Sequence, residues 1–162
     1  MKTNVSYLFR RLFGLVLLFT LSACSTTPQV VDHAFSFDAT ADSPDVEVLD
    51  YRYGDSQVPT ARNPPQMLAL GKSFQGTNIM GPMRRGDSLY VKWRIRSTGE
   101  VHEDTVDLRP RLPNDMTHHR IYFIIRGPQL YVYLISPERR PKDAAPIGPA
   151  IYSYLKTLAI YP

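Results

Sequence analysis

Hydrophobic and polar residues alternate along several short stretches of this chain, most clearly over 89–96. Leu89, Val91, Trp93 and Ile95 occupy every second position there, and tyrosine or charged residues stand between them. Successive side chains of a β-strand point to opposite faces, so a period of two places one face on a hydrophobic core and the other in water. We predict a strand over 89–96.

A turn follows this stretch directly. Ser97 and Thr98 lead into Gly99, and a three-residue hairpin loop needs a left-handed residue at its third position, which glycine supplies without steric cost. The return strand is expected over 100–108. Charged residues are mainly basic on the first strand and acidic on the second, and cross-strand pairs of opposite charge contribute about 0.2–1 kcal/mol each. A solvated ion-pair face explains them without a catalytic role.

A second hairpin is expected further along the chain. The stretches 119–126 and 129–135 both alternate, and Gly127 and Pro128 turn the chain between them. Both faces of the second stretch are apolar or aromatic, because tyrosines and Ile135 stand opposite the leucines and valine. A strand that is apolar on both sides is typical of the middle of a sheet. We therefore expect this hairpin to lie centrally.

Weaker patterns indicate further elements. A strand is expected over 46–53. The residues after Pro149 have helical spacing, and proline suits the first turn of a helix. The stretch 158–161 reads as a closing strand, so we expect a short helix followed by a strand at this end. One more helical turn is expected over 113–118.

The segment 25–44 allows two interpretations. It is small, polar and acidic, and prolines interrupt it, which favours a flexible tether. Twenty flexible residues have an r.m.s. reach of roughly 25 Å, enough to hold a domain clear of a membrane surface. Alternatively, Phe35 and Phe37 begin a first strand, since they alternate with smaller or polar residues.

Four glycines occur in the stretch 71–86, and they predict a long mobile loop. Their spacing does not match a phosphate-binding loop, because neither a lysine nor a helix start follows. Long loops in compact domains often carry function, so this one is the first candidate for partner contact, with a disordered connection as the alternative. The residues proposed for that contact are Met80, Met83, Arg84, Arg85 and Asp87.

The positions of the prolines along the chain indicate the fold class. Nearly all of the 14 prolines fall between the apolar stretches, which is typical of an all-β domain. We predict a mainly antiparallel all-β fold, either a small β-sandwich or a half-open barrel, with one or two short helices. The expected organisation is a signal peptide over 1–23, a lipidated N-terminus and tether over 24–44, and a single β-rich domain over 45–162.

The first residues fit a secretory signal. Lys2, Arg10 and Arg11 are basic and no acid accompanies them, and the following apolar stretch 12–21 is only ten residues long. A bilayer-spanning helix needs about 20 residues, so this stretch suits a signal peptide. Cys24 is the sole cysteine, which excludes an intramolecular disulfide.

The residues Leu21-Ser22-Ala23-Cys24 resemble the bacterial lipobox, an apolar residue and two small residues before an obligatory cysteine. The resemblance implies a lipid on the Cys24 sulfur, cleavage before that residue and acylation of the new amine. Several acyl chains together give stable anchoring, whereas one alone is marginal. Ser25 follows the cysteine, and in Gram-negative lipoproteins this implies the outer membrane. We expect a lipid-anchored protein on its periplasmic face.

Removal of the signal changes the charge. The full chain carries 19 basic and 15 acidic residues, a formal net charge of +4. Since the signal contains three bases and no acid, the mature chain has 16 bases against 15 acids, a net charge of +1. Nucleic-acid binding requires a clustered basic surface, so no nucleic-acid partner is expected.

Catalytic motifs are not found in the sequence. It contains no nucleophile elbow and no dinucleotide fingerprint. His118 and His119 are adjacent, and neighbours on a strand face opposite ways, so they rarely share one metal ion. We expect no enzymatic activity, no catalytic residue, no metal site, and no cofactor beyond the covalent lipid on Cys24.

The run 86–94, GDSLYVKWR, is similar to part of a loose group of uncharacterised proteobacterial lipoproteins. Leu112-Pro113, Ile121-Tyr122-Phe123 and Ile160-Tyr161-Pro162 add to this similarity. Some members of the group look like periplasmic immunity proteins encoded beside phospholipase effectors of type VI secretion systems. The resemblance implies a protein-binding module that blocks a toxic secreted effector. A structural or assembly lipoprotein of an envelope or secretion complex is the alternative.

Overall fold

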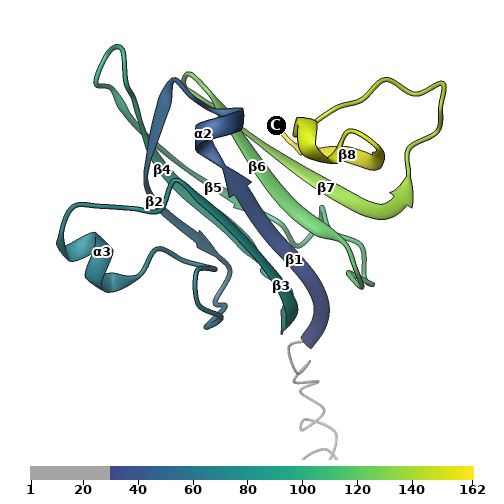
Figure 1. Ribbon diagram of the computed structural model, residues 1–162. Helices are drawn as coiled ribbons and strands as arrows, with labels where there is room; N and C mark the ends of the chain where they lie inside the picture. Colours follow the sequence, from purple (N-terminus) through teal and green to yellow (C-terminus); the bar gives the residue numbers. More distant parts are fainter. Residues whose placement is uncertain (1–29) are drawn as a thin grey trace, which may run out of the picture.

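Two β-sheets pack face to face around a hydrophobic core (Figure 1). The computed structural model describes residues 30–162, so the predicted signal peptide and the lipobox with Cys24 lie outside the described residues. The prediction of a mainly antiparallel all-β fold with short helices is confirmed, in the form of a small β-sandwich. Within the described part, no helix is long and apolar enough to cross a membrane.

The larger sheet has five strands in the order β3-β1-β6-β7-β8. Its strands are antiparallel to their neighbours except for β1 and β6, which run parallel. Its strands are β1 (Val30–Asp38), β3 (Gly76–Arg84), β6 (Arg120–Arg126), β7 (Gln129–Arg139) and β8 (Leu155–Tyr161).

The smaller sheet has the order β2-β4-β5 and contains the first predicted hairpin. Gly99 adopts a φ of 76°, as the turn requires, and the alternate residues of β4 from Leu89 to Ile95 are buried, so this prediction is confirmed. The predicted ion-pair face forms in part, because Lys92 lies 3.6 Å from Glu103. The strands are β2 (Val46–Tyr53), β4 (Ser88–Ile95) and β5 (Val101–Asp107).

The second predicted hairpin is also confirmed, and it lies centrally. The strands β6 and β7 pair antiparallel around Gly127, which has a φ of 56°. One face of β6 packs into the core between the sheets. Tyr122 and Ile124 on its other face belong to a second cluster, against which Tyr152 and Leu155 pack. Burial on both faces follows from the apolar pattern on both sides of this hairpin.

The flexible tether expected for 24–44 is wrong from residue 30 onward, and the alternative interpretation as a strand is confirmed. Phe35 and Phe37 of β1 are buried in the core, and the Phe37 ring stacks on Phe123 with ring centroids 4.3 Å apart. Aromatic burial of this size outweighs the polar character of the surrounding residues. The short helix α2 (Ala39–Asp42) then leads into β2.

The long mobile loop expected over 71–86 is also wrong. Residues 76–84 form β3, which pairs with β1 along nine residues from Gly76 to Arg84. Its alternation is weak in the sequence because one of its faces is open to solvent and because Gly81 and Pro82 interrupt the pattern. A short helix, α3 (Pro65–Ala69), precedes it.

The C-terminal prediction of a short helix followed by a strand is confirmed. The helix is a single 3-10 turn, η1 (Ala150–Tyr152), and β8 begins at Leu155, earlier than the expected 158. The helical turn expected over 113–118 is wrong, since this segment consists of turns and bends. Its Pro113 fixes one backbone angle and provides no amide donor, which limits helix formation there.

Specific polar contacts join the two sheets. The Trp93 indole nitrogen of β4 donates a 2.9 Å hydrogen bond to the Gly127 carbonyl of the other hairpin. The Gln75 side chain bonds both the amide nitrogen and the carbonyl oxygen of Val48, at 2.9 and 2.8 Å, where β2 has an irregular register. The sandwich is therefore held by directed bonds as well as by apolar contact.

Candidate functional site

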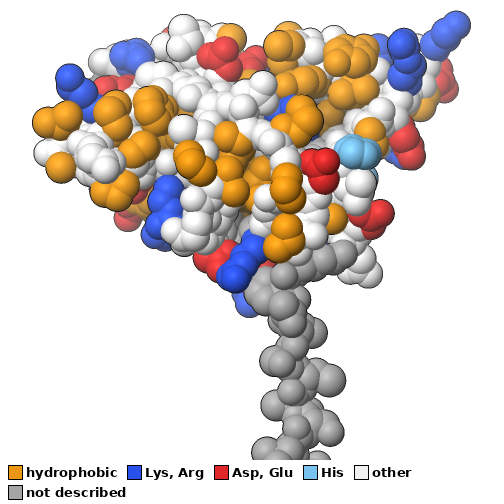
Figure 2. Space-filling model, turned by 60° about the horizontal axis from the view of Figure 1, so that its bottom comes forward, with side chains coloured by type: hydrophobic (Ala, Val, Ile, Leu, Met, Phe, Trp, Pro, Cys, Tyr) orange, Lys and Arg blue, Asp and Glu red, His pale blue; other side chains and the backbone are white. Residues whose placement is uncertain are grey.

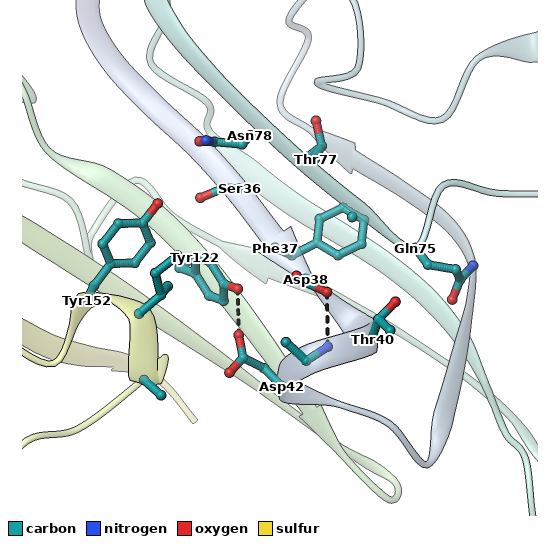
Figure 3. A pocket seen from close by; sticks show the side chains of 14 residues that line it. Ser36, Phe37, Asp38, Thr40, Asp42, Gln75, Thr77, Asn78, Tyr122 and Tyr152 are labelled. Atoms are coloured by element: carbon teal, nitrogen blue, oxygen red, sulfur yellow. Dashed lines mark hydrogen bonds between the residues drawn. The ribbon is translucent and has the colours of Figure 1, made fainter.

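A cleft of about 720 Å³ lies on the outer face of the five-stranded sheet, the face turned away from the smaller sheet (Figure 3). Its lining comes from β1, α2, β3, β6 and η1, which are far apart in the sequence. The lining residues are Ser36, Phe37, Asp38, Thr40, Ala41, Asp42, Gln75, Gly76, Thr77, Asn78, Tyr122, Ala150, Ile151 and Tyr152.

The floor of the cleft is a row of side chains across three adjacent strands. Asn78 of β3 pairs with Ser36 of β1, and Ser36 pairs with Tyr122 of β6. Residues that pair in this way project from the same face of a sheet, so the row presents an amide, a hydroxyl and a phenol to the cleft. Strand register alone therefore sets the spacing of these three groups.

One side of the cleft is fixed by a bond between α2 and β6. The buried Tyr122 hydroxyl donates to an Asp42 carboxylate oxygen at 2.6 Å, and Asp38 accepts a 3.0 Å bond from the Ala41 amide to cap α2 (Figure 3). Burial raises the pKa of Tyr122, and the neighbouring Asp42 carboxylate raises it further. The phenol thus stays protonated and keeps donating.

The opposite side is formed by η1. The Tyr152 ring meets the Tyr122 ring edge-on, with centroids 5.9 Å apart. The approach depends on Gly148, which has a φ of 78° and no side chain, since a Cβ there would lie 3.2 Å from the Tyr133 ring. Glycine permits both the left-handed backbone and the close packing that bring η1 onto the sheet.

Arg120 lies beside the floor and orders it. Its guanidinium donates to the Ser36 hydroxyl at 2.8 Å and to the Asn78 side-chain oxygen at 2.6 Å. It also stacks over the Tyr152 ring, 4.9 Å from the centroid. A planar guanidinium combines such bonds with stacking in one fixed arrangement. Arg120 therefore links the floor of the cleft to η1.

The chemistry of the lining suits binding. Two carboxylates, several hydroxyls and two side-chain amides line the cleft, and the Ile151 side chain is 68 % exposed at its rim. These lining residues include no histidine or cysteine to act as a base or a thiol nucleophile. Within residues 30–162, no group of three histidine, aspartate, glutamate or cysteine side chains is placed to hold a metal ion.

The five residues proposed for partner contact do not form one surface. Met80 is exposed on β3, whereas Met83 is buried in the core. Arg84 forms a 3.0 Å ion pair with Asp55, and Arg85 donates to the Pro113 carbonyl. The Asp87 carbonyl accepts a backbone bond from Leu108. None of the five lines the cleft.

Sequence reasoning missed the cleft residues. The usable signal was the alternation in β6, which predicts that Tyr122 faces away from Ile121 and Phe123. Nothing local connects Tyr122 with Asp42 or Tyr152, which are 80 and 30 positions away. Comparison of the chain with protein-family models, curated proteins and solved structures finds no match.

Proposed function

We propose that this protein is a lipid-anchored binding protein, acylated at Cys24 and held on the periplasmic face of the outer membrane, whose cleft engages a protein partner. In its specific form, the partner is a toxic secreted effector whose active site the protein covers. The observation that carries the proposal is the preformed cleft, in which Tyr122 is fixed by its bond to Asp42 and the floor is ordered by the neighbouring Arg120.

Preorganisation supports binding because groups that are ordered in the free protein lose little conformational entropy when a partner arrives. The cleft volume falls within the range of roughly 300–1,000 Å³ that is typical of ligand sites. Its open rim fits a protruding segment of a partner. An apolar side chain of that segment would contact Ile151 and Tyr152, and its polar groups would bond to Asn78 and the carboxylate of Asp42.

The charge of the lining residues indicates which side chains the partner segment carries. Asp38 and Asp42 are acidic and none of the lining residues is basic, although the Arg120 guanidinium lies beside the floor, where it bonds to Ser36 and Asn78. A lysine or arginine of the partner therefore fits the α2 end of the cleft, where Asp38 and Asp42 lie, better than an acid does. The partner segment is therefore expected to carry one apolar and one basic side chain.

A killing assay tests the proposal in the full-length, acylated protein. Deletion of the gene is expected to make cells sensitive to sibling cells that deliver the effector. Wild type should restore protection, Ile151→Arg should not, and the matched control Val101→Arg should, because Val101 is an exposed aliphatic residue on the opposite sheet. Equal membrane levels of the variants, checked by immunoblot, make the comparison valid.

Two outcomes would overturn the proposal. If the deletion strain stays resistant to its siblings, the immunity function fails. If Ile151→Arg protects as well as wild type does, the cleft is not the contact surface.

A further inference from the structure

The start of β1 lies very close in sequence to the proposed lipid anchor. Five residues separate Cys24 from Val30, where the strand begins. Six residue steps span at most about 20 Å when fully extended. Any flexible chain of this length has an r.m.s. reach of roughly 13 Å. If Cys24 is acylated, this end of the domain must stay beside the bilayer surface.

Exposed apolar side chains lie at this end of the sheet. Val30 is 59 % exposed and pairs across the strands with Arg84. Pro82 and Met80 follow on the same face, since they pair with Asp32 and Ala34, and Met80 is 71 % exposed. Figure 2 shows hydrophobic side chains together with basic and acidic side chains next to the start of β1, and Asp32 on this face is exposed. We call Val30, Met80, Pro82 and Arg84 the β1–β3 end.

We propose that the β1–β3 end docks on the lipid surface, an inference that rests on the proposed lipidation of Cys24. Val30 and Met80 enter the boundary between headgroups and acyl chains, and Arg84, which also pairs with Asp55 at 3.0 Å, faces the lipid phosphates. Apolar side chains flanked by a cation are favoured at this depth. The anchor contributes most of the membrane affinity, and the docking contact fixes the orientation of the domain.

This orientation places the α2 end of the cleft away from the membrane, whereas Asn78, at the other end of the cleft, lies only two residues from Met80 on the same sheet face. A strand rises about 3.3 Å per residue, so Ser36 and Asp38 lie roughly 20 and 26 Å along β1 from Val30. The strand β1 runs from the docked end toward α2, which forms one side of the cleft (Figure 1). The end of the cleft with Asp38 and Asp42 is therefore farthest from the lipid, where a soluble partner can reach it.

Fluorescence quenching on vesicles tests the orientation. The full-length, acylated protein is reconstituted into vesicles of phosphatidylethanolamine and phosphatidylglycerol, with an environment-sensitive dye on a cysteine introduced by Met80→Cys. The control is Thr98→Cys, at the tip of the β4–β5 hairpin, which lies near Asp45 and hence at the opposite end. Cys24 does not react with the dye because its sulfur forms a thioether.

The docked orientation predicts that nitroxide-labelled lipids quench the dye at position 80 about twofold more strongly than at position 98, since docked residues reach the acyl boundary. Equal quenching at the two positions would overturn the inference. So would stronger quenching at a third site, Leu70→Cys, since Leu70 is an exposed apolar residue beside α3.

A second variant separates docking from the short connection alone. Insertion of about twenty Gly/Ser residues between positions 25 and 30 gives the domain a much longer reach. Docking predicts that quenching at position 80 stays above the position 98 control in this variant. A fall to the control value would show that the connection, and not the β1–β3 end, holds the domain near the lipid.

The test also distinguishes the inference from the function on which it rests. If mass spectrometry finds no lipid on residue 24 and the protein does not stay on the vesicles, the proposed anchoring fails. If the lipid is present and position 80 is quenched no more than position 98, only the orientation fails.

Discussion

The Tyr122 hydroxyl of β6 lies 2.6 Å from the Asp42 carboxylate at the end of α2, and it donates its proton to that group. This bond joins residues 80 positions apart and forms one side of the cleft. A bond to a charged acceptor in a partly buried place is stronger than an exposed one. The shape of the cleft therefore depends on this pair.

Replacement of Tyr122 by phenylalanine is expected to lower the free energy of unfolding by about 1–2 kcal/mol, because the bond to a charged acceptor is lost without a change in ring packing. The matched control is Tyr90→Phe, which removes a bond to the exposed Glu103 and should cost less than about 0.5 kcal/mol. Urea denaturation followed by Trp93 fluorescence measures both. Equal losses would contradict the role assigned to Tyr122.

Gly148 and Gly99 offer a matched pair for the close packing of η1. Their φ angles are 78° and 76°, so alanine introduces similar backbone strain at both, about 1–2 kcal/mol. A Cβ at Gly148 would also meet Thr157 and the Tyr133 ring at 3.1–3.2 Å, whereas Gly99 has open space. Gly148→Ala should therefore cost about 1 kcal/mol more by overpacking.

The same two variants, Gly148→Ala and Gly99→Ala, also test whether the cleft depends on η1. Displacement of η1 moves Tyr152, so Gly148→Ala should also reduce protection in the killing assay, and Gly99→Ala should not. If Gly148→Ala and Gly99→Ala have the same stability and the same protection, η1 does not depend on the glycine contact.

Acid should weaken the fold through His33. This side chain is fully buried, its Nδ1 donates to the Val31 carbonyl at 2.8 Å, and its Nε2 accepts from the Tyr53 hydroxyl at 2.9 Å. Burial lowers the pKa of His33 below its usual 6.5, although the nearby Asp32 partly opposes the shift. Burial also raises the pKa of Tyr53 to about 12, so Tyr53 remains a donor.

The direction in which pH changes the free energy of unfolding follows from proton linkage. Below pH 6.5 the unfolded chain binds a proton at this histidine before the folded protein does, so the free energy of unfolding is retained above that pH and decreases as the pH falls. For one proton the slope is at most about 1.4 kcal/mol per pH unit. Urea denaturation between pH 7.5 and 5.5 should show this decrease in wild type and in His119→Gln, whose histidine is only partly buried, but not in His33→Gln. An unchanged slope in His33→Gln would contradict the assignment.

Much of the fold could be predicted from the sequence because two of its hairpins are local. In β4–β5 and β6–β7, adjacent alternating strands and a glycine with positive φ specify the register without distant partners. The pairing of β1 with β3 is different. It joins residues 38–54 positions apart, and β3 alone shows too weak an alternation to be distinguished from a loop.

The cleft could not be predicted because it forms from segments that meet only in the folded chain. Ser36, Asn78 and Tyr122 lie side by side through strand order, which the sequence does not state. The position of η1 depends on the packing of Gly148 against Tyr133, which is equally non-local. The glycines around Met80 and Arg84 predict a loop that contacts a partner, but the structure places both residues in a paired strand.

Intact-mass spectrometry of the full-length gene product, extracted from the membranes of a Gram-negative host, tests the anchoring on which the proposed function and orientation both depend. We predict a polypeptide that begins at Cys24 and carries a diacylglycerol on its sulfur and an acyl chain on its amine. A product that still begins at Met1, or one that begins at residue 24 without lipid, would contradict the account.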